Sequence, residues 1–441
     1  MPLLANRGIL TAKKTAVKHL MLALQQILVI SLIKRLETVF QCCSKGEYIM
    51  ISKLIADRMT KGSWIRKMFE EGNRLKAIYG ADNVFDFSLG NPDLEPPAEV
   101  LAAIREFAND TTPGQHGYMS NAGYLSTRAA VAGQLSRKSG LEIKPEAVCM
   151  TVGAGGALNV ALKALLDPDD EVILLAPFFF EYTSYTNNHN GIPVIVKCDH
   201  ETLLPDFEAI RSAITPRTKA LIINSPNNPS GVIYPREVLE NLDALLREAP
   251  QTIYVLSDEP YNALVFDGET VPDTLTSIAN AIICTSWSKS LSLAGDRIGY
   301  LAVSPRCEDY SRLIEAVPYC NRTLGYVNAP AFFQHVVERA IDARVDISKY
   351  EERRNLLLGI LREAGFDVKT PAGSIYLFPK SPIDDDVAFA QACARHNVTL
   401  VPGTGFGFPG YVRLCFATSQ KTILGSAEAF KTIGREFGLI K

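Results

Sequence analysis

Short apolar runs alternate with amphipathic stretches along the middle of the chain. Helical patterning, with apolar residues on one face, covers segments such as Asp206–Ile214 and Pro235–Arg247. The apolar runs between such segments predict strands at Val148–Val152, Glu171–Ala176, Ala220–Asn224, Thr252–Leu256, Ala281–Cys284 and Ile298–Val303. Strands that are apolar throughout and separated by helices are typical of a mostly parallel sheet with both faces covered. The pattern therefore predicts an α/β fold.

The pattern changes after about residue 330. Helical patterning there covers 326–344, 348–364 and 421–437. Short strands are expected at Phe366–Lys369, Ile375–Pro379, Val398–Val401 and Val412–Ala417. We therefore expect a smaller α+β domain at the C-terminal end. The expected organisation is a leader over 1–49, an N-terminal arm with part of the small domain over 50–95, a large domain over 96–330 and a small domain over 331–441.

Residues 1–49 differ in composition from the rest. They are rich in lysine and arginine, and Glu37 and Glu47 are their only acidic residues. Their apolar stretch, Leu20–Ile33, is short for a membrane span, and no clear cleavage site of a signal peptide follows it. One interpretation is a disordered or helical leader that lies on a membrane or a partner. The interpretation that we favour is an upstream extension absent from the native protein, with Met50 as the true start.

Overall composition excludes several functional classes. The chain has 441 residues, of which 47% are hydrophobic and 21% charged, as in globular proteins. A net charge of −3 does not favour a nucleic-acid surface. The nine cysteines show no CxxC spacing and the six histidines form no cluster, so we expect reduced thiols, a cytoplasmic location and no metal site.

Polar residues follow several of the predicted strands. The small-residue turn Gly153–Ala157 opens a helix, which is a geometry that binds anions through backbone N–H groups. Asn228, Asp258 and Lys289 each follow a later strand. Ligands of parallel sheets bind at the carboxyl ends of the strands, so these residues are expected to share one site. A lysine buried there would have a lowered pKa and could form a Schiff base with a carbonyl compound.

Four motifs, in this order, carry a family resemblance: Asn-Asn-Pro-Ser-Gly at 227–231, Ser-Asp-Glu-Pro-Tyr at 257–261, Ser-Trp-Ser-Lys at 286–289 followed by Arg297, and Val-Arg-Leu at 412–414. From about Ile51 onward the chain resembles the class I, aspartate aminotransferase-like, pyridoxal-phosphate-dependent aminotransferases of fold type I. The resemblance implies a seven-stranded type of sheet in the large domain and pyridoxal 5'-phosphate as the cofactor. It also implies a homodimer whose active site is shared between subunits.

The resemblance also assigns roles to individual residues. Lys289 would hold the cofactor as a Schiff base and move the α-proton, and Asp258 would pair with the ring nitrogen. The other cofactor contacts that it implies are Phe179 stacked on the ring, Asn228 and Tyr261 at the ring oxygen, and Ala154, Gly155, Gly156, Ser286, Arg297 and the partner subunit's Tyr118 at the phosphate. The substrate carboxylate would be bound by Gly90, Asn228 and Arg413.

The expected reaction transfers an amino group from an L-amino acid to a 2-oxoacid such as 2-oxoglutarate. A pyridoxal-phosphate-dependent C–S or β-lyase is an alternative that uses the same cofactor residues. A transcriptional regulator of the same fold is a weaker alternative. Such regulators carry an N-terminal DNA-binding domain, and only 49 residues precede Met50. Some aspartate-specific members have a lysine where this chain has Gly155, and no cation obviously replaces it, Arg322 being the one alternative. Aspartate specificity is therefore not expected, and the donor is not identified.

Overall fold

The structure is a computed structural model of the chain and describes residues 51–53, 55–56 and 64–441. Residues 64–441 belong to one compact unit, whose architecture is given below. The predicted leader over 1–49 and the predicted start at Met50 lie outside the described residues. No helix in the described part is both long enough and apolar enough to cross a bilayer.

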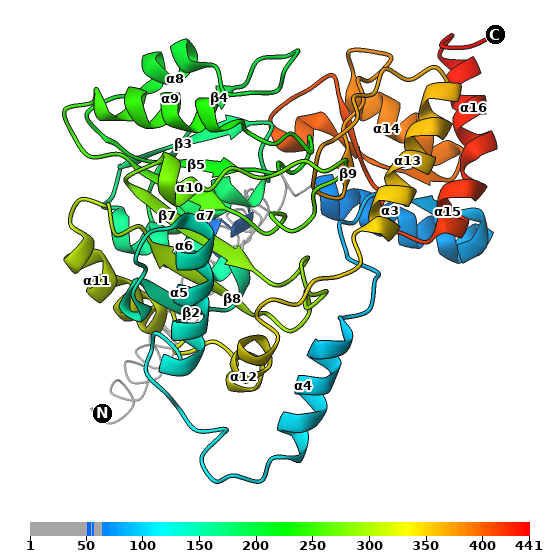
Figure 1. Cartoon of the computed structure of the whole chain (residues 1–441). Coiled ribbons are helices and arrows are strands. Elements are labelled where there is room, and N and C mark those ends of the chain that lie inside the picture. Colours follow the sequence, from blue (N-terminus) through cyan, green and yellow to red (C-terminus); the bar gives the residue numbers. More distant parts are fainter. Residues whose placement is uncertain (1–50, 54, 57–63) are drawn as a thin grey trace, which may run out of the picture. The chain divides into compact units, whose positions relative to one another are not determined.

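A seven-stranded sheet forms the core of the larger part of this unit, on the left in Figure 1. The strand order is β2-β8-β7-β6-β5-β3-β4, and β8 runs antiparallel to both of its neighbours while the other pairs are parallel. The strands are β2 (Val148–Thr151), β3 (Glu171–Ala176), β4 (Ile192–Lys197), β5 (Thr218–Asn224), β6 (Tyr254–Asp258), β7 (Ala281–Ser286) and β8 (Gly299–Val303). The predicted mostly parallel α/β sheet is confirmed.

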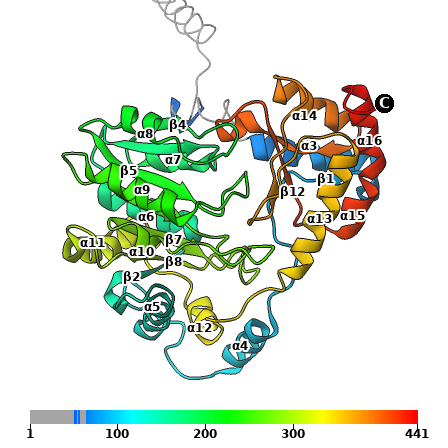
Figure 2. The same ribbon diagram turned by 45° about the horizontal axis from the view of Figure 1, so that its top comes forward.

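Alternate residues of the central strands enter two separate hydrophobic cores. In β3, Ile173 and Leu175 pack into one core, whereas Val172 and Leu174 pack into the other. This alternation follows from the two-residue period of a strand and requires helices on both faces. The helices of this part are α5 (Leu125–Ser139), α6 (Gly153–Leu165), α7 (Glu181–Asn188), α8 (Phe207–Ala213), α9 (Arg236–Arg247), α10 (Thr274–Ser277) and α11 (Tyr310–Thr323) (Figure 2).

A third core belongs to the elements that precede and follow the large sheet in sequence. It is rich in phenylalanine, including Phe389, Phe416 and Phe430. Its strands are β9 (Tyr376–Leu377), β11 (Val401–Pro402) and β12 (Val412–Cys415) in one antiparallel sheet, and β1 (Phe85–Asp86) paired in parallel with β10 (Val398–Thr399). The helices around it are α3 (Trp64–Tyr79), α13 (Ser348–Glu363), α14 (Asp386–Arg395), α15 (Gln420–Gly425) and α16 (Ala427–Glu436). The pairing of β1 with β10 joins the segment before Gly90 to the C-terminal part.

Helices α4 (Ala98–Asn109) and α12 (Ala331–Arg339) pack against each other, and α12 also packs on α5. Helix α12 is shorter than the helix predicted over 326–344, because it begins only after Pro330 and ends at Arg339. The domain boundaries predicted at 95 and 330 remain a prediction.

Several sequence-based elements were wrong or missing. Residues 366–369 form no strand, although Phe366 and Val368 are buried in the third core. The C-terminal helix breaks at Ser426, whose hydroxyl donates to the Ile423 carbonyl oxygen at 2.7 Å. Edge strand β4 was not predicted because it contains Pro193 and is partly exposed, which hides the usual strand pattern. Helices α11 and α14 were also missed.

Candidate active site

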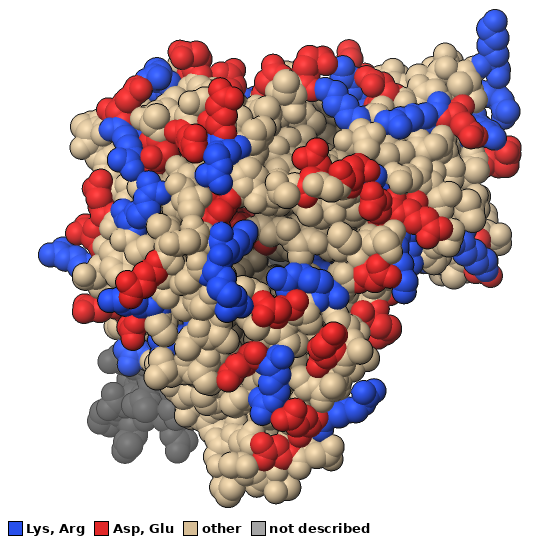
Figure 3. All heavy atoms as spheres, viewed as in Figure 1, with Lys and Arg blue, Asp and Glu red and all other residues tan. Residues whose placement is uncertain are grey.

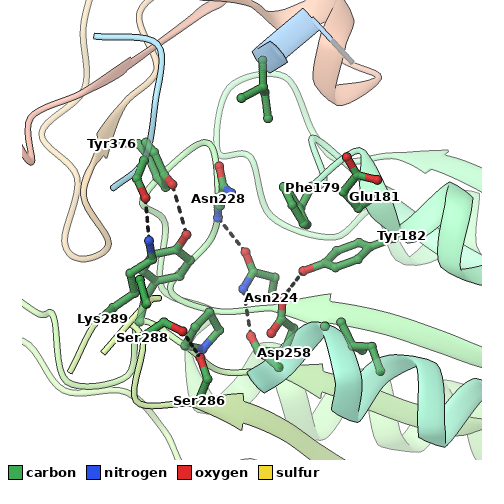
Figure 4. A pocket seen from close by; sticks show the side chains of 18 of the residues that line it. Phe179, Glu181, Tyr182, Asn224, Asn228, Asp258, Ser286, Ser288, Lys289 and Tyr376 are labelled. Carbon is green, nitrogen blue, oxygen red and sulfur yellow. Dashed lines mark hydrogen bonds between the residues drawn. The ribbon is translucent and has the colours of Figure 1, made fainter. Parts of the chain in front are cut away.

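A cavity of about 500 Å³ lies at the carboxyl ends of the central strands (Figure 4). The sequence-predicted site residues that line it are Gly90, Ala154, Gly155, Phe179, Asn228, Asp258, Tyr261, Ser286, Lys289, Arg297 and Arg413. Gly156 lies one position further along α6 and is buried against Val152 instead. Tyr118 is 93% exposed and is not among the lining residues. The structure thus brings together eleven of the thirteen predicted residues within one cavity.

Lys289 enters the cavity just after strand β7 ends at Ser286. Its Nζ donates a hydrogen bond of 2.5 Å to the carbonyl oxygen of Gly90. Burial lowers the pKa of Lys289 to about 8, an effect that Cys415 opposes and the positive charges of Arg413 and Arg297 reinforce. Roughly a tenth of this amine is therefore neutral, and nucleophilic, at pH 7, far more than for a lysine of ordinary pKa.

Asp258 is the last residue of β6, the neighbour of β7 in the sheet. The Tyr182 hydroxyl on α7 donates a hydrogen bond of 2.5 Å to its Oδ2. Its Oδ1 is buried and has no hydrogen-bond partner among the described residues. Burial raises the pKa of Asp258 to about 7; the bond from Tyr182 lowers it and the charge of Glu259 raises it. Oδ1 can therefore accept a hydrogen bond from an N–H group of a ligand bound in the cavity.

Asn224, the last residue of β5, fixes the loop that carries Asn228. Its side-chain nitrogen donates to the backbone oxygen of Asp258 at 2.8 Å, and its Oδ1 accepts from the backbone N–H of Asn228 at 2.6 Å. The side-chain oxygen of Asn228 in turn accepts a hydrogen bond of 3.1 Å from Arg413 Nη1. One asparagine thus ties two neighbouring strand ends together and orients the amide that faces the cavity.

Arg413, on strand β12, is only 1% exposed. Besides its bond to Asn228, its Nη2 donates to the Ser88 carbonyl oxygen at 2.6 Å. Its Nε is buried without a hydrogen-bond partner in the described part of the chain. The guanidinium also lies over the ring of Tyr376, 4.4 Å from the ring centre. A buried cation with no carboxylate partner among the described residues favours an anionic ligand.

The first turn of α6 and Arg297 also line the cavity, and they lie close together. Arg297 donates to the carbonyl oxygens of Ala294 at 2.9 Å and Val152 at 3.3 Å. Gly153 has a φ of +83°, and a Cβ there would lie 2.7 Å from the Arg297 guanidinium. Only glycine fits that turn, so the arginine can approach the helix start, where unpaired backbone N–H groups favour an anion.

Tyr261 and Tyr376 close the side of the cavity near Lys289. Their hydroxyl oxygens are 3.1 Å apart and hydrogen-bonded. Gly90 lies directly against this pair, because a Cβ at Gly90 would be 1.9 Å from the Tyr376 hydroxyl oxygen. The glycine is therefore required for close packing of the backbone on the tyrosine.

The lining residues that sequence reasoning missed include Arg66, Glu181, Tyr182, Tyr185 and Asn224. Asn224 was detectable, since it is the last residue of the predicted strand Ala220–Asn224. Tyr182 and Tyr185 gave a weaker signal, lying three and six residues after Phe179 on a short helix. Arg322, the one alternative cation, lies outside the cavity with its guanidinium over the ring of Tyr319.

On the face shown in Figure 3, positive and negative side chains are interspersed, in agreement with the net charge of −3. The concentration of like-charged side chains is instead inside the cavity, where Lys289, Arg297 and Arg413 all contribute. Positive charge is thus directed toward a small anionic ligand.

Comparison with known proteins places this site in a family. The family model described as aminotransferase class I and II matches residues 82–430. The chain is 35% identical over 353 residues to the aspartate/prephenate aminotransferase of Thermus thermophilus, covering 78% of this chain and 90% of that protein. It is 32% identical over 360 residues to the aspartate aminotransferase of Thermotoga maritima, covering 80% of this chain and 93% of the relative.

A solved structure of an aminotransferase from Eubacterium rectale superposes with a TM-score of 0.85 at 37% identity, covering 89% of this chain and 100% of that one. The match of the family model, the identity to the relatives and the shared fold agree with the resemblance carried by the four motifs. The chain belongs to the class I and II aminotransferase family and is a pyridoxal-phosphate-dependent aminotransferase.

Proposed function

We propose that this aminotransferase moves an amino group from an L-amino acid to a 2-oxoacid such as 2-oxoglutarate, with Lys289 as the residue that binds the cofactor covalently. The observation that carries the proposal is the placement of Asp258 and Lys289 at the carboxyl ends of two adjacent strands, both lining one cavity. An amine with a pKa of about 8 and a buried carboxylate are thus available to the same small ligand.

The lining residues fit pyridoxal phosphate. The unpartnered Oδ1 of Asp258 would accept a hydrogen bond from the protonated ring nitrogen. Phe179 would stack on the ring, and Asn228 and Tyr261 would contact the ring oxygen. The α6 turn, with Ala154, Gly155 and Gly156, would bind the phosphate together with Ser286 and Arg297. When bound, the cofactor supplies the carbonyl that receives the amino group and a ring that accepts the electron pair released at the substrate Cα.

The protein residues then have separate tasks. Lys289 Nζ would take the proton from the substrate Cα and deliver it to C4′ of the cofactor, which its lowered pKa favours. The buried carboxylate of Asp258 keeps the ring nitrogen protonated. Arg413 binds the substrate α-carboxylate, with Gly90 and Asn228 beside it. Because Arg413 is held by Ser88 and Asn228 before substrate arrives, little orientation remains to be fixed on binding.

We also propose a cytoplasmic homodimer in which the partner subunit's Tyr118 completes the phosphate site. Tyr118 supports this, since a large aromatic side chain that is 93% exposed would gain from burial by a second copy. Light scattering during gel filtration would test it, because a monomeric holoenzyme is incompatible with a shared site. Cell fractionation would test the location.

The reaction is tested by exposing the holoenzyme to a panel of L-amino acids and following the cofactor spectrum. We expect conversion by amino donors and recovery on addition of 2-oxoglutarate. Lys289→Ala should abolish both the absorbance of the covalently bound cofactor and turnover, whereas Lys349→Ala, on helix α13 outside the cavity, should preserve both. Release of pyruvate and ammonia without an oxoacid would instead identify the lyase alternative.

A further inference from the structure

The charged residues that line the cavity are Arg66, Glu181, Asp258, Lys289, Arg297 and Arg413. The proposed function, on which this inference rests, assigns the last four to the cofactor and the substrate carboxylate. Arg66 and Glu181 remain for the substrate side chain. Arg66 is 80% exposed and pairs with Glu70 at 2.9 Å on its own helix, α3. Glu181 is therefore the charged lining residue that is available to interact with the substrate side chain.

Glu181 is the first residue of α7 and is partly buried. No described residue forms an ion pair or hydrogen bond with its carboxylate. In Figure 4 it lies beside Phe179, on the side of the cavity away from Lys289. Burial raises its pKa above the ordinary value, which is the expected effect of partial desolvation without a compensating cation.

The cavity that Glu181 lines is mostly apolar, and its apolar lining residues include Ile65, Phe69 and Leu158. Phe179 lies beside Glu181 in Figure 4, and the charge of Glu181 contributes to the raised pKa of Tyr185. Gly155 contributes no side chain, and a Cβ there would already lie 3.0 Å from the Tyr185 hydroxyl. A substrate side chain in this region therefore meets apolar walls along its length and one unpaired carboxylate.

We propose that this region selects amino donors with an apolar stem and a distal cation, such as lysine-like side chains, and that Glu181 is the residue that recognises the cation. A half-buried carboxylate attracts a distal ammonium or guanidinium group and repels a distal carboxylate. The stem of such a donor packs against the aromatic and aliphatic walls, as lysine stems do on apolar surfaces. Glu181 is thus a specificity-determining residue that acts on the side chain and not on the reacting atoms.

The first test compares kcat/KM of the holoenzyme for L-lysine, L-norleucine and L-glutamate. We expect the wild-type enzyme to prefer lysine over norleucine by roughly 10-fold and glutamate to be the poorest donor. Glu181→Gln should remove the preference for lysine, leave norleucine within about two-fold and improve glutamate. Glu237→Gln, an exposed acid on α9, should keep the wild-type order.

The second test measures binding without reaction, using the pyridoxamine form of the holoenzyme, which has no carbonyl for an amine to attack, and analogues that lack the α-amino group. These are 6-aminohexanoate, hexanoate and glutarate, whose dissociation constants are obtained from the change in cofactor absorbance. We expect 6-aminohexanoate to bind most tightly to the wild-type holoenzyme, and Glu181→Gln to weaken it to the level of hexanoate. Equal binding of 6-aminohexanoate and hexanoate to the wild type, or a preference that survives Glu181→Gln, would overturn the inference.

The two tests also separate this inference from the proposed function. Transamination that ignores Glu181 would overturn the inference and leave the reaction intact. Binding of 6-aminohexanoate that depends on Glu181, in an enzyme that does not transaminate any donor, would overturn the reaction and support the side-chain site.

Discussion

The Tyr182 hydroxyl donates a hydrogen bond of 2.5 Å to Oδ2 of Asp258, while Oδ1 of the same carboxylate has no partner in the described part of the chain. Tyr182 is 1% exposed and Asp258 is 6% exposed, so this bond forms in a low-dielectric environment where it has a large effect. It fixes one oxygen of the carboxylate and leaves the other free for the proposed contact with the cofactor. Tyr182 is therefore a positioning residue for Asp258.

Tyr182→Phe should weaken cofactor binding. Loss of a hydrogen bond to a charged group costs roughly 1.5–3 kcal/mol, so the dissociation constant of the cofactor should rise about 10- to 100-fold. The pKa of Asp258 in the cofactor-free protein should also rise, because the bond from Tyr182 lowers it in the wild type. Fluorescence titration with pyridoxal phosphate measures the first effect.

Tyr254→Phe is the matched control for Tyr182→Phe. This buried tyrosine donates a long bond of 3.4 Å to the Glu308 carbonyl oxygen, away from the cavity. Its substitution should leave the affinity for the cofactor unchanged. If both variants bound the cofactor as tightly as the wild type, Tyr182 would have no positioning role.

The stability of the cofactor-free protein should fall as pH rises toward 7. Asp258 has a pKa of about 7 in the folded protein against an ordinary value of 3.8, so between these values the folded state binds the proton and the unfolded state does not. Ionisation of Asp258 should therefore lower the free energy of unfolding by about 2 kcal/mol between pH 5.5 and pH 8.5. Urea unfolding at the two pH values measures this change.

Asp258→Asn supplies the comparison, since an amide does not titrate. The difference in stability between wild type and variant should depend on pH in the cofactor-free protein. A constant difference from pH 5.5 to pH 8.5 would show that Asp258 has an ordinary pKa. Saturation with the cofactor should reduce the pH dependence, because the ring nitrogen would pair with the ionised carboxylate.

Capture of the cofactor by the cofactor-free protein should accelerate with pH up to about 8. Only the neutral amine of Lys289 attacks a carbonyl, and burial lowers its pKa to about 8. The rate constant should rise steeply below pH 8 and level off above it, as measured by stopped-flow absorbance. A rise that continues toward pH 10 would contradict the lowered pKa.

Arg413→Lys should raise KM for every amino donor, whatever its side chain. Arg413 already donates to Ser88 and Asn228, and a lysine cannot keep both bonds while forming two more with a carboxylate. We expect kcat/KM to fall by about 100-fold, equivalent to roughly 3 kcal/mol. Arg362→Lys, whose guanidinium contacts Val368 and Thr370 outside the cavity, should leave kcat/KM unchanged. A loss confined to one class of donor would show that Arg413 contacts the side chain instead.

The sequence by itself determined the layers of the fold and the principal members of the site. Apolar runs and helical periodicity are local properties, so they predicted six of the seven strands of the large sheet. Parallel strands end at one edge, which is why the residues after them, among them Asn228, Asp258 and Lys289, could be assigned to one cavity. Edge strand β4 escaped because its exposed residues and Pro193 lack that local signal.

Only the tertiary structure decided which side chains complete the site. Tyr182 and Asp258 are 76 residues apart, and Lys289 and Gly90 are 199 apart, yet each pair is hydrogen-bonded. Such contacts depend on the order of strands in the sheet and on the face that a short helix turns inward. Glu181 and Tyr182 are neighbours in sequence, but Glu181 lies beside Phe179 in the cavity wall whereas Tyr182 is hydrogen-bonded to Asp258. No local pattern encodes that direction, because it is fixed by how α7 packs on the sheet.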